Sequence, residues 1–376
     1  MILFKNAKIF YNGDFFDGDI LVEKGVIKQI GNIENSDCPC IDINNNYILP
    51  GFVDIHSHGA MNVDFMSDCP EAIETLIKYY ASNGTTSVLA TTYTEDYQKI
   101  KDSIKRISSY IGKSNIVGIN IEGPYISPQK KGAQNESYIR KPDIAEFDEL
   151  IEISNNNIKM ITIAPEINNA IESIEYLKSR DVVCSLGHSC ADYDTACKAI
   201  SAGASVITHF FNGLEPLNHR NPSIVGAGLI NEDITLEIIC DGYHIHKDLI
   251  KYLFKTKKNQ LALVTDSVSP AGCADGDYLF AGLPIQKCGE KITLKQGGNL
   301  AGSALKMSNA LKNALEFTQM EPKDIIPSLT IIPAKAINID SKKGSLEIGK
   351  DADFVITDKN FNILSTYLQG KKIYSK

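Results

Sequence analysis

The chain has 376 residues, enough for one large domain or for a large domain with a smaller one. Hydrophobic residues make up 43% and charged residues 22%, which is typical of a globular protein with a sizeable core. The net charge of −8 argues against a surface for nucleic acid or another polyanion. A small anionic substrate would therefore need a local cation of its own.

The sequence predicts neither a secreted nor a membrane protein. Residues 1–16 lack the basic start and continuous apolar core of a signal peptide. No apolar run approaches the roughly 20 residues that span a bilayer. The nine cysteines are scattered without a CxxC pair, Cys38 and Cys40 being the closest in sequence. We interpret them as reduced thiols and expect a cytoplasmic protein.

The two ends of the chain share a pattern of short strands and turns. Residues 1–49 alternate apolar and polar positions between Gly-Asp and Lys-Gly turns, which predicts a β-meander. The last forty residues have a similar pattern. We therefore expect residues 1–49 and 336–376 to pair into one small β-sandwich domain beside a larger domain formed by residues 50–335.

The middle of the chain alternates between strand-like and helix-like segments. Helices are predicted between most of the strands, for example over 70–83, 144–155, 170–180, 192–202 and 247–257. Apolar runs predict eight strands, at 51–56, 86–92, 115–123, 158–165, 182–188, 205–211, 235–242 and 261–267. This order predicts an α/β fold, a parallel (β/α)8 or TIM barrel. A helix over 304–320 and a segment at 330–337 return the chain to the small domain.

Residues of metal-binding and catalytic types stand at the ends of these predicted strands. They are His56 and His58 (first strand), Glu122 (third), His188 (fifth), His209 (sixth), Asp241 with His244 (seventh) and Asp266 (eighth). In a (β/α)8 barrel the carboxyl ends of the strands share one face, where active sites lie. Each residue alone is more often structural. Together they predict a metal site at that face. Because side chains alternate along a strand, His56 and His58 lie on the same side of theirs.

Seven sequence blocks also carry a resemblance to a known family: LPGFVDIHSHG, IEGPYISPQKKGAQ, LGHS, THFFNGLEPLNHR, CDGYHIH, LVTDS and LAGSAL. In this order they resemble the motifs of the N-acetylglucosamine-6-phosphate deacetylase family within the amidohydrolase superfamily. The C-terminal segment 329–358 resembles the return segment of that superfamily, so the resemblance covers essentially the whole chain. The HxH pair and the eighth-strand aspartate indicate only a metal-dependent hydrolase, whereas the other blocks together are more specific.

The resemblance implies a reaction and a metal centre. The substrate would be N-acetyl-D-glucosamine 6-phosphate, hydrolysed to D-glucosamine 6-phosphate and acetate in amino-sugar catabolism or cell-wall recycling. Glu122, His188 and His209 would hold the principal divalent metal, and His56 and His58 a second one, with Glu122 as the bridge. One or two ions per subunit are therefore expected, and mixed N/O ligation suits Zn²⁺ or Fe²⁺. The alternative for these five residues is a hydrogen-bonded barrel core without metal.

The resemblance further implies the catalytic and substrate-binding residues. Asp266 would take a proton from the attacking water and pass it to the departing amine, because amines leave poorly unless protonated; the alternative is a helix N-cap. Arg220 and His244 would bind the phosphate, and the family places the equivalent arginine in the partner's site, which implies a homodimer. The remaining sugar-lining positions of the family are Ala133, Gln134, Asn212, Gly213, Leu300, Ala301 and Gly302.

One position departs from the family pattern. Relatives often carry histidine where this chain has Gln134, near the acetamido group. Glutamine keeps an N–H donor but cannot become charged or transfer a proton. If that position assists carbonyl polarisation, this enzyme depends more on its metals.

Two alternatives to this function stay open. The first is another amidohydrolase, such as an N-acetylgalactosamine-6-phosphate deacetylase, because nothing in the sequence separates the two epimers. A dihydroorotase-like enzyme is disfavoured, since such enzymes commonly use a carboxylated lysine where the third strand here ends in Glu122. The second is a non-catalytic scaffold, which the retained ligand residues and Asp266 disfavour. No nucleic-acid or membrane partner is expected.

Overall fold

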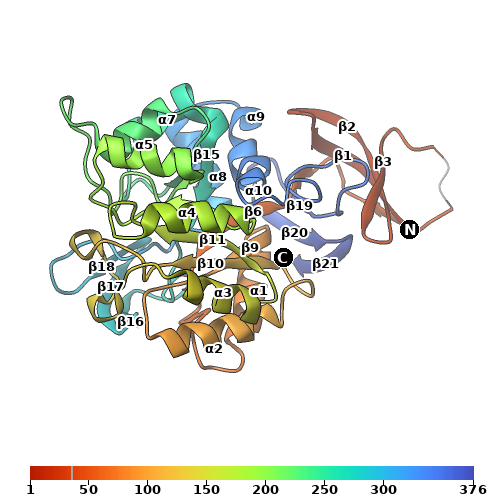
Figure 1. Ribbon diagram of the computed structural model, residues 1–376. Coiled ribbons are helices and arrows are strands. Elements are labelled where there is room, and N and C mark those ends of the chain that lie inside the picture. Colours follow the sequence, from red (N-terminus) through yellow and green to blue (C-terminus); the bar gives the residue numbers. More distant parts are fainter. Residues whose placement is uncertain (35–36) are drawn as a thin grey trace.

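The structure is a computed structural model that describes residues 1–34 and 37–376. Eight parallel strands form the barrel that makes up most of the molecule (Figure 1). In sheet order these strands are β6 (Phe52–Ser57), β9 (Thr85–Thr92), β10 (Ile116–Glu122), β11 (Ile158–Ile163), β12 (Val183–Leu186), β13 (Val206–Ile207), β14 (Thr235–Ile239) and β15 (Leu261–Val264). Each strand lies within one of the predicted segments, except that β6 ends one residue later, at Ser57, and β9 begins one residue earlier, at Thr85. Neighbouring strands pair in parallel. The predicted (β/α)8 barrel is confirmed.

The barrel closes where its first strand, β6, meets its last, β15. The hydrogen-bonded strand order begins at β15 and ends at β6, and the buried carboxylate of Asp54 joins these two ends. Asp54 accepts hydrogen bonds from the backbone N–H of Thr265 (3.2 Å) and from its hydroxyl (2.6 Å). Just beyond, the N–H of Asp266 donates to the carbonyl of His56 (2.8 Å). The closure therefore sets Asp266 beside the HxH pair.

Helices cover the outside of the barrel, as expected for a parallel sheet buried on both faces. They are α1 (Ala72–Ser82), α2 (Tyr97–Ser108), α3 (Ile144–Ile153), α4 (Ala170–Ser179), α5 (Tyr193–Ala202), α6 (Ser223–Ile230), α7 (Lys247–Lys257), α8 (Met307–Thr318), α9 (Pro322–Ile325) and α10 (Ile331–Ala336). Short 3-10 turns are η1 (Pro128–Lys130), η2 (Glu136–Tyr138), η3 (Lys258–Gln260) and η4 (Ile326–Leu329). Of the helices in the described ranges, none combines the length and apolarity needed to cross a membrane.

Capping residues and apolar spacing explain where these helices form. The carboxylates of Asp96, Asp143 and Asp192 accept backbone N–H groups in the first turns of α2, α3 and α5. Helix α2 buries Ile100, Ser103, Ile104 and Ile107, a spacing of three and four residues that places one face against the barrel.

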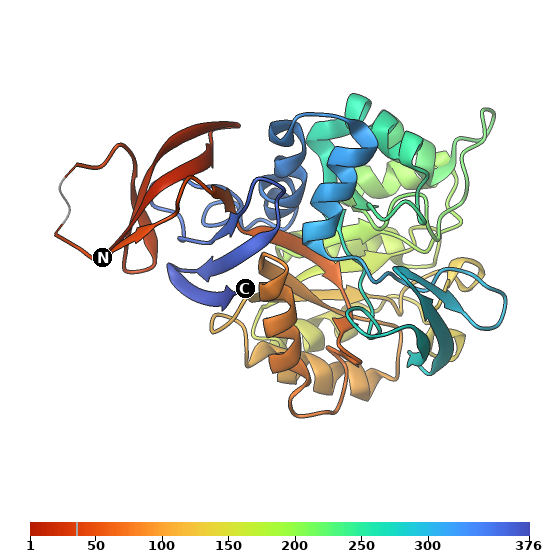
Figure 2. The same cartoon turned by 180° about the vertical axis from the view of Figure 1, so that it is seen from behind.

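A small antiparallel sheet follows β15 and was not predicted. It consists of β16 (Gly276–Phe280), β17 (Leu283–Cys288) and β18 (Lys291–Leu294), paired in that order. A further two-stranded ribbon, β7 (Gly59–Ala60) with β8 (Val63–Asp64), follows the HxH pair. Figure 2 shows β16–β18 at the side of the barrel opposite the chain termini.

Strands from both ends of the chain form a second sheet, as the sequence pattern indicates. Its strands are β1 (Ile2–Tyr11), β2 (Asp14–Glu23), β3 (Val26–Gly31), β4 (Cys40–Asp42), β5 (Tyr47–Pro50), β19 (Phe354–Thr357), β20 (Ile363–Leu368) and β21 (Lys371–Ser375). β1, β2 and β3 form the predicted meander, and the antiparallel pair β5–β19 joins the two chain ends. In Figure 1 β1–β3 stand away from the barrel, with β19–β21 between them and the barrel.

Candidate metal centre and active site

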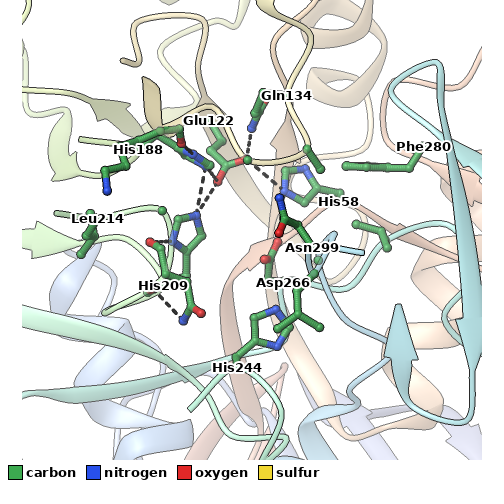
Figure 3. A pocket seen from close by; sticks show the side chains of 18 of the residues that line it. His58, Glu122, Gln134, His188, His209, Leu214, His244, Asp266, Phe280 and Asn299 are labelled. Atoms are coloured by element: carbon green, nitrogen blue, oxygen red, sulfur yellow. Dashed lines mark hydrogen bonds and ion pairs between the residues drawn. The ribbon is translucent and has the colours of Figure 1, made fainter. Parts of the chain in front are cut away.

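The functional side chains meet around a cavity of about 610 Å³ at the carboxyl ends of the barrel strands (Figure 3). Most residues that the sequence singles out line this cavity, namely His58, Glu122, Ala133, Gln134, His188, His209, Asn212, Gly213, His244, Asp266, Leu300 and Gly302. His56 lies beneath it and is fully buried. Arg220 and Ala301 are not among the described residues that line it.

The first cluster brings together Glu122, His188 and His209. Oε1 of Glu122 lies 3.1 Å from Nε2 of His188 and 3.0 Å from Nε2 of His209, and the two Nε2 atoms are 3.2 Å apart. All three residues are buried. Glu122 ends strand β10, whereas His188 and His209 each stand two residues beyond the end of their strand, β12 and β13. Three strands of the barrel thus contribute one ligand-type atom each to one point.

The second cluster contains the HxH pair and shares Glu122 with the first. The Nε2 atoms of His56 and His58 are 3.3 Å apart. Oε1 of Glu122 lies 3.4 Å from Nε2 of His56, and Oε2 lies 3.3 Å from Nε2 of His58. Oε1 of Glu122 therefore faces His188, His209 and His56, and Oε2 faces His58, so one carboxylate is shared by both clusters.

These distances and the outer contacts of the imidazoles fit a divalent metal. A tetrahedral ion with ligands at about 2.0–2.1 Å holds neighbouring ligand atoms roughly 3.3 Å apart. Nδ1 of His188 lies 2.7 Å from the carbonyl oxygen of Lys130, and Nδ1 of His209 lies 3.0 Å from that of Asn212. These acceptors place the proton on Nδ1 and leave the Nε2 lone pair facing the cluster. Such outer contacts are typical of metal-binding histidines.

The electrostatics of the site also fit a cation. Burial raises the pKa of Glu122, but His56 and His188 outweigh burial and hold that pKa well below its usual value. Burial lowers the pKa of His58, but its contacts with Asp266 and Glu122 outweigh burial and raise the pKa to about 9. The buried carboxylates thus favour the positively charged form of the neighbouring histidines, and a divalent ion bound there would supply positive charge in the same way.

Asp266 lies beside the HxH pair and lines the cavity. Its Oδ1 lies 3.3 Å from Nε2 of His58 and 3.6 Å from Nε2 of His56, and the side chain reaches the cavity. Burial raises the pKa of Asp266, but contacts with His58 and His56 outweigh it and hold the pKa below its usual value. The next regular element along the chain is the strand β16, so the helix N-cap interpretation of Asp266 does not apply.

Three of the strand-end residues have an uncommon backbone conformation. His188, His209 and Asp266 have φ angles of 47°, 29° and 46°, values that residues other than glycine rarely adopt. Each stands two residues after its strand ends, so the left-handed turn redirects the side chain from the strand toward the cavity. Strained backbone of this kind concentrates at functional sites.

Gln134 and Asn212, two predicted sugar contacts, form hydrogen bonds with residues of the first cluster or next to it. The carboxamide of Gln134 donates to Oε2 of Glu122 and accepts the N–H of Thr94 (2.6 Å). The carboxamide of Asn212 donates to the carbonyl oxygens of His209 (3.3 Å) and Phe210 (3.2 Å). Both side chains therefore orient the clusters, and they reach the cavity at its wall.

Of the two residues predicted to bind the phosphate, His244 lines the cavity and Arg220 does not. Oδ2 of Asp241 lies 2.6 Å from Nδ1 of His244, which leaves Nε2 of the ring available to the cavity. Arg220 is exposed on the loop after Asn212. Ala301 is buried, and its N–H donates to the carbonyl of Ile292 (3.2 Å).

The structure adds four residues that the sequence did not single out. Lys130 and Asn299 line the cavity, and Phe280 of β16 closes one side, with its ring 5.6 Å from that of His58. Glu237 is fully buried in β14 and contacts both clusters. A signal for Glu237 exists in the sequence, because a charged residue inside the apolar run TLEIICDG is unusual for a buried parallel strand.

Comparisons with known proteins agree with this geometry. A model of the amidohydrolase family matches residues 47–373. The chain is 34% identical over 359 residues to the N-acetylgalactosamine-6-phosphate deacetylase of Escherichia coli O157:H7, with 94% of each protein covered. It is 35% identical over 335 residues to the N-acetylglucosamine-6-phosphate deacetylase of Bacillus subtilis strain 168, covering 87% of this chain and 84% of that protein. The crystal structure of N-acetylglucosamine-6-phosphate deacetylase from Thermotoga maritima superposes with a TM-score of 0.90 at 34% identity, covering 100% of both chains.

Proposed function

This chain belongs to the amidohydrolase family, and on that basis we propose that it hydrolyses N-acetyl-D-glucosamine 6-phosphate to D-glucosamine 6-phosphate and acetate. One observation carries the proposal: two ligand clusters share Glu122 beside Asp266 in one cavity. The identity of 34–35% to deacetylases of amino-sugar phosphates supports the substrate class. A catabolic or wall-recycling role in the cytoplasm stays a prediction.

The clusters have distinct proposed roles. A divalent metal held by Glu122, His188 and His209 would polarise the acetamide carbonyl and make the attacking water more acidic. His56 and His58 would hold a second ion, with Glu122 shared between the two. We propose Zn²⁺ or Fe²⁺, because imidazole and carboxylate ligands suit both.

Asp266 is the proposed general base and general acid. Its carboxylate faces the cavity beside both clusters, within reach of a water that attacks an acetamide bound there. The depressed pKa keeps Asp266 ionised at neutral pH, ready to accept the proton of the water. The same proton then passes to the amide nitrogen, so that the amino sugar leaves as a neutral amine. Nε2 of His58 also lies 3.3 Å from Oδ1 of Asp266, so the same residue contacts the proposed base.

The phosphate requires cations, and we propose that two subunits supply them. Lys130 is the one lysine or arginine among the described residues that line the cavity, and its Nζ lies 3.1 Å from Oε2 of Glu215. His244 contributes a ring nitrogen from the same chain. Arg220 is exposed and outside the cavity of its own chain, which supports the predicted homodimer in which Arg220 reaches the partner's phosphate site.

The galacto epimer is the second candidate substrate, because one relative of similar identity is an N-acetylgalactosamine-6-phosphate deacetylase. Acetate release from both sugar phosphates and from unphosphorylated N-acetylglucosamine tests the proposal. We expect the highest kcat/KM on N-acetylglucosamine 6-phosphate and little turnover of the unphosphorylated sugar. Faster turnover of the galacto compound would overturn the choice of epimer. No turnover of either phosphate by metal-loaded protein would overturn the substrate class.

A further inference from the structure

Glu237 lies behind the cavity and touches one histidine of each metal cluster. It is fully buried in β14, the strand between β13 and β15. Its Oε2 accepts the backbone N–H of His209 (3.0 Å) and lies 2.9 Å from Nδ1 of His56. One carboxylate oxygen therefore joins a residue of the first cluster to a residue of the second.

The contact defines which nitrogen of His56 faces the cluster. Because Oε2 of Glu237 is an acceptor, the hydrogen bond assigns the proton of His56 to Nδ1. The Nε2 lone pair then faces Nε2 of His58 at 3.3 Å and Oε1 of Glu122 at 3.4 Å. A carboxylate behind a metal-binding imidazole fixes the ring and increases its basicity.

The group behind the histidine ring differs in charge between the two clusters. Nδ1 of His188 and Nδ1 of His209 face neutral main-chain carbonyls, whereas Nδ1 of His56 faces a carboxylate. Both clusters share Glu122 as their carboxylate. Within the described part of the chain, Nδ1 of His58 is buried without a hydrogen-bond partner. Glu237 is thus the carboxylate behind the ring of His56 in the HxH pair.

The other oxygen of Glu237 points to the same conclusion. Oε1 is buried and has no hydrogen-bond partner among the residues that the structure describes. A buried carboxylate that is incompletely hydrogen-bonded is costly unless positive charge lies close by. A cation on Nε2 of His56 would supply that charge through the imidazole ring.

We propose that Glu237 is a positioning residue for the second divalent-cation subsite at His56 and His58. It acts through Oε2, which holds the ring of His56 so that Nε2 faces the cluster. This proposal rests on the metal-dependent function proposed above, because it concerns the same centre.

The proposal is tested by titrating chelator-treated full-length protein with Zn²⁺. Binding is monitored by calorimetry, and the metal content per chain is measured on the same samples. Wild-type protein should bind two ions per chain in separable steps. In Glu237→Gln, which keeps the size of the side chain, the weaker step should lose about 10- to 100-fold in affinity. The tighter step should change by less than about threefold. Asp353→Asn, which removes a buried carboxylate outside the cavity, is the matched control and should keep both steps.

A single ion per wild-type chain would overturn the proposal, as would equal weakening of both steps or no change in Glu237→Gln. If Glu237→Gln does not fold, the same titration of Glu237→Asp decides. Its shortened carboxylate should weaken the second step, and an unchanged second step would overturn the proposal. Metal binding is measured directly here. Two bound ions without acetate release would therefore contradict the proposed substrate and leave the role of Glu237 intact.

Discussion

At the scale of single residues, the types of the site residues could be predicted, but their partners could not. Histidines and carboxylates at the ends of apolar runs predicted one metal site, because parallel strands end at a common face, and the family resemblance implied its division into two clusters. The acceptors behind the rings, such as the carbonyl of Lys130 behind His188, come from loops whose course the sequence does not specify. The contact of Gln134 with Glu122 depends on the same loop.

The hydrogen bond between Asp241 and His244 gives a prediction about phosphate recognition. Asp241→Asn removes the charge that orients the ring, and hydrogen bonds to charged groups contribute about 1.5–3 kcal/mol. We expect KM for N-acetylglucosamine 6-phosphate to rise about 10- to 100-fold in steady-state assays, with a smaller change in kcat. The residual activity on the unphosphorylated sugar is the control. An equal loss on both sugars would contradict a role in binding the phosphate.

At the scale of elements, the pattern of apolar residues predicted the buried barrel strands but not the sheet β16–β18. The eight barrel strands are apolar runs flanked by turns, and all eight were identified. The sheet β16–β18 alternates between partly buried and exposed residues, so it lacks a continuous apolar run. Phe280 reaches the cavity through this sheet, and its place could not be inferred from spacing. Asp54 and Glu237 lie inside apolar strands, and both join neighbouring strands.

The closure of the barrel by Asp54 gives a prediction about stability. Each of the two carboxylate oxygens of Asp54 accepts one donor of Thr265, and Asp54→Asn replaces one of these oxygens by an N–H group. We expect the free energy of unfolding in urea to fall by about 1–3 kcal/mol, the cost of a lost buried hydrogen bond. Asp102→Asn on the exposed face of α2 should change it by less than about 0.5 kcal/mol. Equal stability of the two variants would show that Asp54 does not hold β6 to β15.

At the scale of the whole molecule, a metal bound at the two clusters would link metal binding to folding, because the cluster residues come from the ends of four barrel strands, β6, β10, β12 and β13. Removal of metal by a chelator should lower the thermal midpoint, and added Zn²⁺ should restore it. A ligand present at 100 times its Kd stabilises the folded state by about 2.7 kcal/mol. The thermal midpoint of each sample is the measurement. An unchanged midpoint after complete metal removal would contradict a metal centre inside the barrel.

The proposed homodimer gives a prediction that only an assembly of two chains can satisfy. If Arg220 acts in the partner's site, Arg220→Ala and Asp266→Asn proteins, each weakly active, should complement each other when mixed and allowed to exchange subunits. One site of such a mixed dimer has both Asp266 and the partner's arginine, so acetate release should approach half that of wild type per mixed dimer. Two copies of the same variant are the control. No gain on mixing would place Arg220 in its own chain's site or outside catalysis.

The most direct measurement is acetate release from N-acetylglucosamine 6-phosphate by metal-loaded wild-type and Asp266→Asn proteins, with metal content determined on the same samples. We predict release by the wild type and a loss of about 10²- to 10⁴-fold in Asp266→Asn, the usual contribution of a general acid or base. The metal content of the two proteins should be equal. An Asp266→Asn protein that keeps most of its activity, or a fully loaded wild type that releases no acetate, would contradict the proposed deacetylase.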